Sequence, residues 1–193
     1  MRLVLAILLL AVVVGWATGG RIGRLSALRI RWAPLAIVGL ALQFFFPSRG
    51  DGPYLFLMGS FLILTVFAAA NLRTPGFALV LAGMLMNFLV IGINHGMPVT
   101  THALVTSSQQ ATLTELVEAG GAKHHLAGPN DRLLFLGDVI GLPTPVGQAV
   151  SAGDVVAYLG VGYVVIAAMR RREDEVPAAS SGAEAQPEGA ARG

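Results

Sequence analysis

Long stretches without a charged side chain divide this sequence, and they predict where helices cross a membrane. No Asp, Glu, Lys or Arg occurs in residues 3–20, 32–48, 52–72, 74–114 or 155–169. A membrane-spanning helix needs about 20 mostly apolar residues. The pattern predicts an all-α fold, an integral membrane bundle of five helices at Leu3–Thr18, Trp32–Phe46, Tyr54–Asn71, Gly76–Ile93 and Val155–Met169.

The one long connection, residues 94–154, is predicted to be an ordered and partly helical loop. Thr112 and Glu115 have the spacing of a capping box, in which each side chain satisfies a free amide at a helix start. Ser151 and Asp154 have residue types that are common at helix N-termini, so we expect them to begin the last helix.

Domain boundaries follow from the same pattern. Residues 1–172 form the predicted transmembrane domain, and residues 173–193 are rich in Ala, Gly, Ser, Pro and Glu, which predicts a disordered cytoplasmic tail. Within the loop, the apolar run Leu133–Ile140 is too short to cross a membrane. We expect it to lie on the bundle or along the membrane interface.

The first apolar segment has a second interpretation. Met1 and Arg2 followed by Leu3–Val14 also fit a secretory signal peptide, with a cleavage region at residues 17–19. Cleavage would leave an arginine-rich segment, residues 21–31, on the outer face of the membrane. Cytoplasmic segments are normally the basic ones, which favours a retained helix.

The distribution of basic residues predicts the orientation. With five spans and an inner C-terminus, the inner segments carry nine basic residues: Arg21, Arg24, Arg29, Arg31, Arg73, Arg170, Arg171, Arg172 and Arg192. The outer segments carry four: Arg2, Arg49, Lys123 and Arg132. Basic residues concentrate on the cytoplasmic side, so we expect the N-terminus outside and the C-terminus inside.

Composition supports a membrane protein and excludes several functions. Charged residues make up 12% of the 193 residues and apolar residues 54%, whereas soluble domains carry about 25% charged residues. The absence of cysteine excludes disulfides and thiol nucleophiles, and a net charge of +2 does not suggest a nucleic-acid partner. Arginine outnumbers lysine and alanine is abundant, which is typical of GC-rich bacterial genomes and suggests a bacterial plasma membrane.

Titratable side chains gather in the long loop, which makes it the candidate place for chemistry. All four histidines lie in residues 95–125, and five of the eleven acidic residues also lie in the loop. Asp138 is the candidate acid, because it interrupts an apolar run and needs a partner such as Arg132, Lys123 or a histidine of the loop. His124 and His125 are the candidate bases, and being adjacent they should point in different directions. No spacing in the sequence is typical of a metal site.

Amide side chains suggest a second set of ligand-binding candidates. Gly83, Asn87 and Asn94 lie on one helical face by their spacing, the last of them directly after the predicted fourth span. Such a face is usually a close helix contact in which the amide bonds across to a neighbour. Ligand binding is the alternative, and Asn87, Asn94 and the adjacent His95 are its candidates.

Four short motifs resemble a known family. They are Asn94-His95-Gly96-Met97-Pro98-Val99, Lys123-His124, Leu136-Gly137-Asp138-Val139-Ile140 and Ser151-Ala152-Gly153-Asp154. Together they resemble a domain-of-unknown-function family of small bacterial membrane proteins, over roughly Leu3–Met169. The resemblance implies a membrane location and a helical fold, and it implies no activity and no cofactor.

Three functions remain open from the sequence. The favoured one is a binding or accessory component of the bacterial cell envelope, with the lipid bilayer and a membrane protein as partners, because no catalytic motif and no ionisable residue occurs within the spans. The second is a membrane enzyme that uses Asp138 with His124 or His125. The third is a small-solute carrier with Asn87 and Asn94 along its path.

Overall fold

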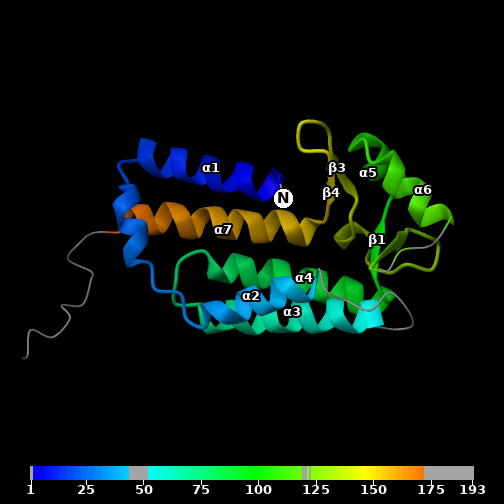
Figure 1. The fold of residues 1–193 in the computed structure, drawn as a ribbon, viewed down its shortest axis with the longest axis horizontal. Helices are drawn as coiled ribbons and strands as arrows, with labels where there is room; N and C mark the ends of the chain where they lie inside the picture. The colour runs from blue at the N-terminus through cyan, green and yellow to red at the C-terminus, as the bar shows by residue number, and fades with distance from the viewer. Residues whose placement is uncertain (1, 44–51, 119–120, 122, 172–193) are drawn as a thin grey trace, which may run out of the picture.

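The computed structural model describes residues 2–43, 52–118, 121 and 123–171, and these residues are mostly helical. Figure 1 shows two parts, a bundle of long helices and a smaller cap at one end of it. The cap comprises residues 97–150. The predicted tail, residues 173–193, lies outside the described residues.

Three helices are long and apolar enough to cross a membrane: α3 (Gly52–Ala70), α4 (Phe77–Asn94) and α7 (Ala152–Arg170). With a rise of about 1.5 Å per residue, helices of 18 and 19 residues extend for about 27–29 Å, close to the ~30 Å thickness of the hydrocarbon core. They coincide with the predicted third, fourth and fifth spans. The three helices therefore point to a protein embedded in a membrane.

The first two predicted spans form shorter helices. α1 runs over Arg2–Ala17 and α2 over Ala33–Leu42. The end of the predicted span Trp32–Phe46 falls partly outside the described residues, and α2 begins one residue later than predicted because Trp32 is left-handed (φ 56°) and Pro34 occupies the first helical turn. Five helices form in the bundle, whereas five crossings of a membrane stay a prediction.

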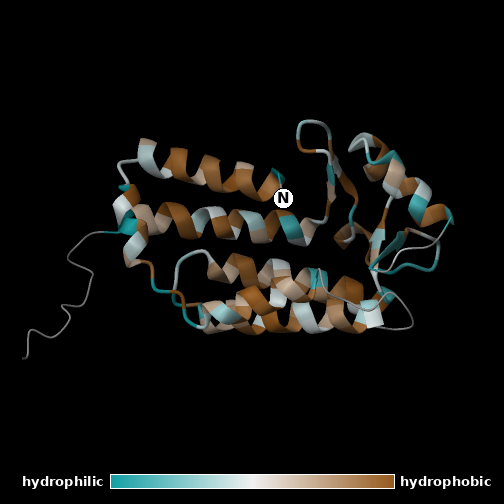
Figure 2. Ribbon diagram, in the orientation of Figure 1, coloured by the Kyte–Doolittle hydropathy of each residue, from teal (hydrophilic) through white to brown (hydrophobic). Residues whose placement is uncertain are grey.

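The bundle helices lie side by side in the order α1, α7, α4, α3 and α2 (Figure 1). Figure 2 shows apolar residues along the whole length of these helices and polar residues in the cap and at the opposite end. Leu9, Ile37 and Leu159 expose 67%, 69% and 64% of their surface. Apolar surface of this extent is what a lipid environment covers.

α4 and α7 approach each other closely through small residues. Gly83 lies against the backbone of Gly153, and Gly160 lies against the backbone of Gly76 and Val80. The predicted helix contact at Gly83 and Asn87 is therefore confirmed. Small residues at such a contact let two membrane helices pack backbone to backbone.

The cap combines short helices with two small sheets. Its elements are β1 (Met97–Val99), α5 (Thr101–Thr106), α6 (Gln110–Glu118), β2 (His124–Leu126), a 3₁₀ turn η2 (Leu134–Leu136), β3 (Ile140–Leu142) and β4 (Gln148–Val150). β1 pairs with β2 in parallel, and β3 pairs with β4 antiparallel. The all-α prediction thus omitted the sheets, because strands of three residues are too short to show a period-2 pattern.

The start of α6 and the apolar run Leu133–Ile140 test two further predictions for the loop. The capping box at Thr112 and Glu115 is wrong, because α6 already begins at Gln110 and Thr112 lies inside it. The docking of Leu133–Ile140 on the bundle is confirmed by Leu136, which is buried in a cluster with Phe61 and Ile91. Phe135, by contrast, points outward and is 66% exposed.

Candidate functional site

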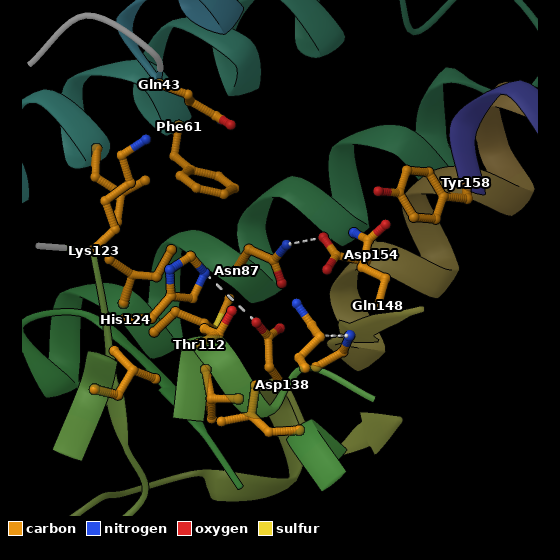
Figure 3. Close-up of a pocket in the computed structure, with 18 residues that line it drawn as sticks. Gln43, Phe61, Asn87, Thr112, Lys123, His124, Asp138, Gln148, Asp154 and Tyr158 are labelled. Atoms are coloured by element: carbon orange, nitrogen blue, oxygen red, sulfur yellow. Dashed lines mark hydrogen bonds and ion pairs between the residues drawn. The ribbon is translucent and has the colours of Figure 1, made fainter. Parts of the chain in front are cut away.

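A cavity of about 360 Å³ lies at the junction of bundle and cap. The cap-side halves of α3, α4 and α7, together with Gln43 after α2, form one side, and β1, α5, α6, β2 and β4 of the cap form the other. Figure 3 shows Asn87, His124, Asp138, Asp154 and Tyr158 around it. Apolar side chains complete the wall: Leu57, Phe61, Ile91, Met97, Val99, Leu104 and Leu116.

The backbone of β1 holds Asp138 in place. Its N–H donates to the carbonyl of Pro98 at 2.9 Å, and its own carbonyl accepts from the N–H of Thr100 at 3.2 Å. The residue is only 7% exposed. Its Oδ1 has no hydrogen-bond partner among the described residues, and its Oδ2 lies 3.6 Å from Nε2 of His124. The predicted pairing of Asp138 with a loop histidine is therefore present, at a distance slightly too long for a hydrogen bond.

The surroundings of this pair favour uncharged side chains. Burial, followed by the nearby Asp154 carboxyl, raises the pKa of Asp138 well above its ordinary value. The His124 side chain is 48% exposed, and loss of solvent around its ring together with the neighbouring Lys123 ammonium lowers the pKa of His124, although Asp154 opposes this shift. A neutral carboxylic acid can donate a proton and a neutral imidazole can accept one, so the pair offers both functions to a molecule in the cavity.

Asn87 and Asp154 form a second polar group, which joins α4 to α7. Asn87 Nδ2 donates to Oδ1 of Asp154 at 2.7 Å, and Ser151 Oγ donates to Oδ1 of Asn87 at 2.9 Å (Figure 3 shows the first of these). Asp154 also completes a capping box with Ser151 at the start of α7, as the residue types predicted. Asp154 is thus a structural residue that also lines the cavity.

β2 separates the two adjacent histidines. Side chains alternate along a strand, so His124 points to Asp138 whereas His125 points to Asp131, with 2.9 Å between His125 Nε2 and Asp131 Oδ1. Burial opposes ionisation of Asp131, but hydrogen bonds from the Gly128 N–H and the His125 ring outweigh it and lower the pKa of Asp131. The residues that line the cavity include His124 and not His125.

Of the three ligand-binding candidates, the structure brings only Asn87 to the cavity. Asn94 instead makes two hydrogen bonds to the backbone of Arg132, at 2.8 Å and 2.9 Å, and so fixes the loop to the end of α4. His95 adopts a left-handed conformation (φ 54°) after α4 and lies against the ring of Tyr54, with 5.2 Å between the ring centres. Asn87 and Asn94 therefore do not line a common path within this cavity.

Polar residues that the sequence did not single out as site candidates also line the cavity. Gln148, Tyr158 and Thr112 contribute an amide and two hydroxyls. The sequence could have indicated Tyr158 as a cavity residue through its spacing from Asp154, because residues four apart share a helix face. Among the described residues, no three His, Asp or Glu side chains are placed to hold a metal ion.

Comparison with known proteins places this architecture in a family. The profile of DUF5317, described as a family of unknown function, matches residues 27–166. The chain belongs to this DUF5317 family. The match confirms the resemblance to a family of unknown function, and it includes all four of the side chains at the centre of the cavity, Asn87, His124, Asp138 and Asp154. No curated protein and no solved structure matches the chain.

Proposed function

We propose that this DUF5317 protein is a binding component of a bacterial cell envelope, and that it holds a small molecule in the cavity between bundle and cap. The observation that carries the proposal is the carboxyl of Asp138, which is buried with an unpartnered oxygen and faces a cavity of about 360 Å³. A buried polar group without a partner is costly, and a ligand that bonds to it removes that cost. The volume lies in the roughly 300–1,000 Å³ range of small-molecule sites.

The lining indicates the chemistry of the molecule. The lining combines hydrogen-bonding groups, among them Asp138, His124 and Gln148, with aliphatic and aromatic side chains such as Ile91 and Phe61. The polar groups of the Asp138–His124 pair favour their neutral forms. We therefore expect a compact molecule of mixed polarity, with a hydroxyl, amine or amide group directed at Asp138.

Two Asp–His pairs in the cap allow a matched test. The protein is purified in mild detergent, and small molecules released on denaturation are identified by mass spectrometry. Asp138→Asn removes the carboxyl at the cavity, whereas Asp131→Asn changes the other pair, which does not line it. We expect one compound to accompany the wild type and the Asp131 variant and to be depleted in the Asp138 variant. Equal small-molecule content in all three proteins would contradict the proposal.

A second candidate function is acid–base catalysis, and the 3.6 Å approach of Asp138 Oδ2 to His124 Nε2 favours it. The neutral acid and neutral imidazole could transfer protons to and from one bound molecule. NMR titration of isotope-labelled histidines tests this. The His124 signal should titrate below the ordinary histidine range and change in Asp138→Asn, while the signal of His125 stays constant in that variant. An unchanged His124 signal would show that the two side chains act independently.

Helix directions support an orientation with the N-terminus outside, the C-terminus inside and the cap on the outer face. The start of α1 lies near the cap, where Arg2 Nη1 donates to the carbonyl of Pro145 at 3.5 Å, and its end lies beside Met169 near the end of α7. The remaining bundle helices alternate in direction. α2 and α4 run toward the cap, so that Gln43 after α2 and Asn87 of α4 both line the cavity, whereas α3 and α7 run away from the cap. This alternation fits five passes. The arginine-rich end is then cytoplasmic, as the positive-inside rule requires.

A further inference from the structure

The bundle carries a second hollow at the end opposite the cap, and arginine side chains surround it. Its volume is about 300 Å³. Arg24 comes from the 3₁₀ helix η1 (Ile22–Ala27), Arg73 from the connection between α3 and α4, and Arg170 and Arg171 from the end of α7. Four arginines from three separate segments thus line one hollow.

Among the described residues, the side chains around this hollow give it a positive charge. Within the described ranges, all the acidic residues lie in the cap or at the first turn of α7: Glu115, Glu118, Asp131, Asp138 and Asp154. Arg73, Arg170 and Arg171 form no ion pair with any of these described carboxylates. Arginine stays charged at any physiological pH, so an anion in the hollow would relieve the mutual repulsion of these groups.

Apolar residues line the same hollow and form its wall, and the arginines form what we call its rim. Leu28, Val164, Ala167 and Ala168 form this wall, and Ala168 is almost fully buried. Val164 precedes Arg170 by six residues of α7, so the wall extends about 9 Å along the helix from the rim. A free phosphate would contact only the rim. A phospholipid would place its phosphate at the rim and its glycerol and first acyl carbons along the wall.

We propose that this arginine hollow binds the head group of an anionic phospholipid. Guanidinium groups form paired hydrogen bonds with phosphate oxygens, and clustered basic residues near a membrane surface gain about 1 kcal/mol each from anionic lipid. The position at one end of three membrane-capable helices puts the rim where lipid head groups lie. The inference is independent of the ligand proposed for the cavity at the cap.

The test measures lipid binding to the full chain by native mass spectrometry from detergent, with added phosphatidylglycerol and with phosphatidylcholine as the zwitterionic reference. The wild type should retain phosphatidylglycerol in preference. The double variant Arg73→Gln/Arg170→Gln should lose affinity by about tenfold or more, since two contacts are removed. Arg132→Gln, a matched change at an exposed arginine of the cap, should leave lipid binding unchanged. Equal binding of both lipids, or equal affinity in the double variant, overturns the proposal.

Two further arms separate the lipid from other anions. Inorganic phosphate, added against chloride at equal ionic strength, should not displace phosphatidylglycerol; displacement would assign the hollow to free phosphate and overturn the lipid proposal. The chain also has an acidic run, Glu173-Asp174-Glu175, close to Arg171 in sequence. Replacing these three by Gln, Asn and Gln in the full chain should leave phosphatidylglycerol affinity unchanged within about twofold. A gain of tenfold or more would show that the acidic run is the occupant, and would also overturn the proposal.

Discussion

At the scale of single residues, the cap contains two Asp–His pairs with opposite electrostatic character. Burial and Asp154 raise the pKa of Asp138, whereas hydrogen bonds from Gly128 and His125 lower that of Asp131. The first carboxyl is held in a place that favours the neutral acid, and the second in a place that favours the carboxylate. The perturbed pKa of the first carboxyl is the reason that the proposed function rests on the Asp138 pair and uses the Asp131 pair as its control.

This contrast predicts opposite effects of pH on stability. A raised pKa means that the folded protein binds the Asp138 proton more tightly than the unfolded chain does. The folded protein therefore becomes less stable as the pH rises above the ordinary carboxyl range. Asp138→Asn should melt at a higher temperature than the wild type at pH 7–8, with little difference near pH 4. Thermal unfolding in detergent measures this, and about 2–4 °C is expected for each kcal/mol.

Asp131→Asn serves as the comparison and should behave in the opposite way. Because the pKa of Asp131 is lowered, its carboxylate stabilises the folded protein at pH values above the ordinary carboxyl pKa. This contribution disappears as the pH falls through the pKa of the folded state. The variant should be less stable than the wild type at pH 7 and approach it in acid. If the two variants shift the melting temperature in the same direction at pH 7, the assignment of the two environments is wrong.

In the Asn87–Asp154 hydrogen bond, the amide donates and the carboxylate accepts, and this direction can be tested by exchanging the two side chains. Asp154 accepts from Asn87 Nδ2 at one oxygen and from the N–H of Ser151 at the other. Asn87→Asp should be strongly destabilising, because it places two carboxyls in contact. Adding Asp154→Asn exchanges donor and acceptor, so each hydrogen bond can form again. A double-mutant cycle followed by melting temperature should show a coupling of about 0.5–3 kcal/mol, and additive effects would exclude the pairing.

Sequence reasoning at this scale succeeded where the determinants are local. Ser151 and Asp154 form their capping box because the interacting groups are three residues apart. The choice of His124 as the partner of Asp138 could not be made from the sequence, which left Arg132, Lys123 and the loop histidines open. It depends on the register Met97↔His124 between strands far apart in the chain.

At the scale of elements, the contact between α4 and α7 depends on glycine. A Cβ atom at Gly160 would lie 2.6 Å from the backbone nitrogen of Val80 and 2.8 Å from the carbonyl oxygen of Gly76. Backbone atoms cannot rotate away as a side chain can. The two helices would have to separate to admit even a methyl group, and the polar pair that joins them at Asn87 lies further along the same contact.

Gly160→Ala should therefore lower stability by about 1–3 kcal/mol, the usual effect of overpacking. Gly59→Ala is the matched control, because Gly59 also lies within a helix but has no atom within 4 Å of an added Cβ. Alanine is the better helix former, so the control should be neutral or slightly more stable. Thermal melting in detergent compares the two, and a similar loss in both would show that the helix contact is not the cause.

Elements were predictable to the extent that they extend over many residues. α3, α4 and α7 follow the charge-free stretches closely, because a membrane helix must be apolar over its full length. The strands β1 to β4 have three residues each, and their pairing arises from tertiary contacts in the cap. α6 begins at Gln110 instead of Thr112 because the helix start is not fixed by the Thr–Glu spacing alone.

At the scale of the whole molecule, charge separates the two ends. The described acidic residues and the histidines lie in the cap or at the ends of α4 and α7 that adjoin it, and the opposite end holds the arginine hollow. The chain lacks cysteine, so single cysteines can report the location of each end. Asn130, exposed in the cap, and Ser26, exposed in η1, are suitable positions.

With the proposed orientation, a membrane-impermeant maleimide added to intact cells should label Asn130→Cys and spare Ser26→Cys. Permeabilised cells should show labelling of both, which controls for accessibility. A fluorescent protein fused to the C-terminus should be bright, and alkaline phosphatase fused there should be inactive. Labelling of Ser26→Cys in intact cells, with Asn130→Cys protected, would reverse the orientation.

The position of α7 between α1 and α4 has a consequence for biosynthesis. α1 contacts α7 through Gly15 and Met169, and the Arg21 N–H donates to the Met169 carbonyl at 2.9 Å. At roughly 5–20 residues per second, the ribosome completes α7 on the order of 10 s after α1. In the proposed five-pass arrangement, α1 would have only lipid during that interval on the face that α7 later covers. A translation product that stops before Ala152 lacks α7 and therefore lacks the contacts that join α1 to α4 through it.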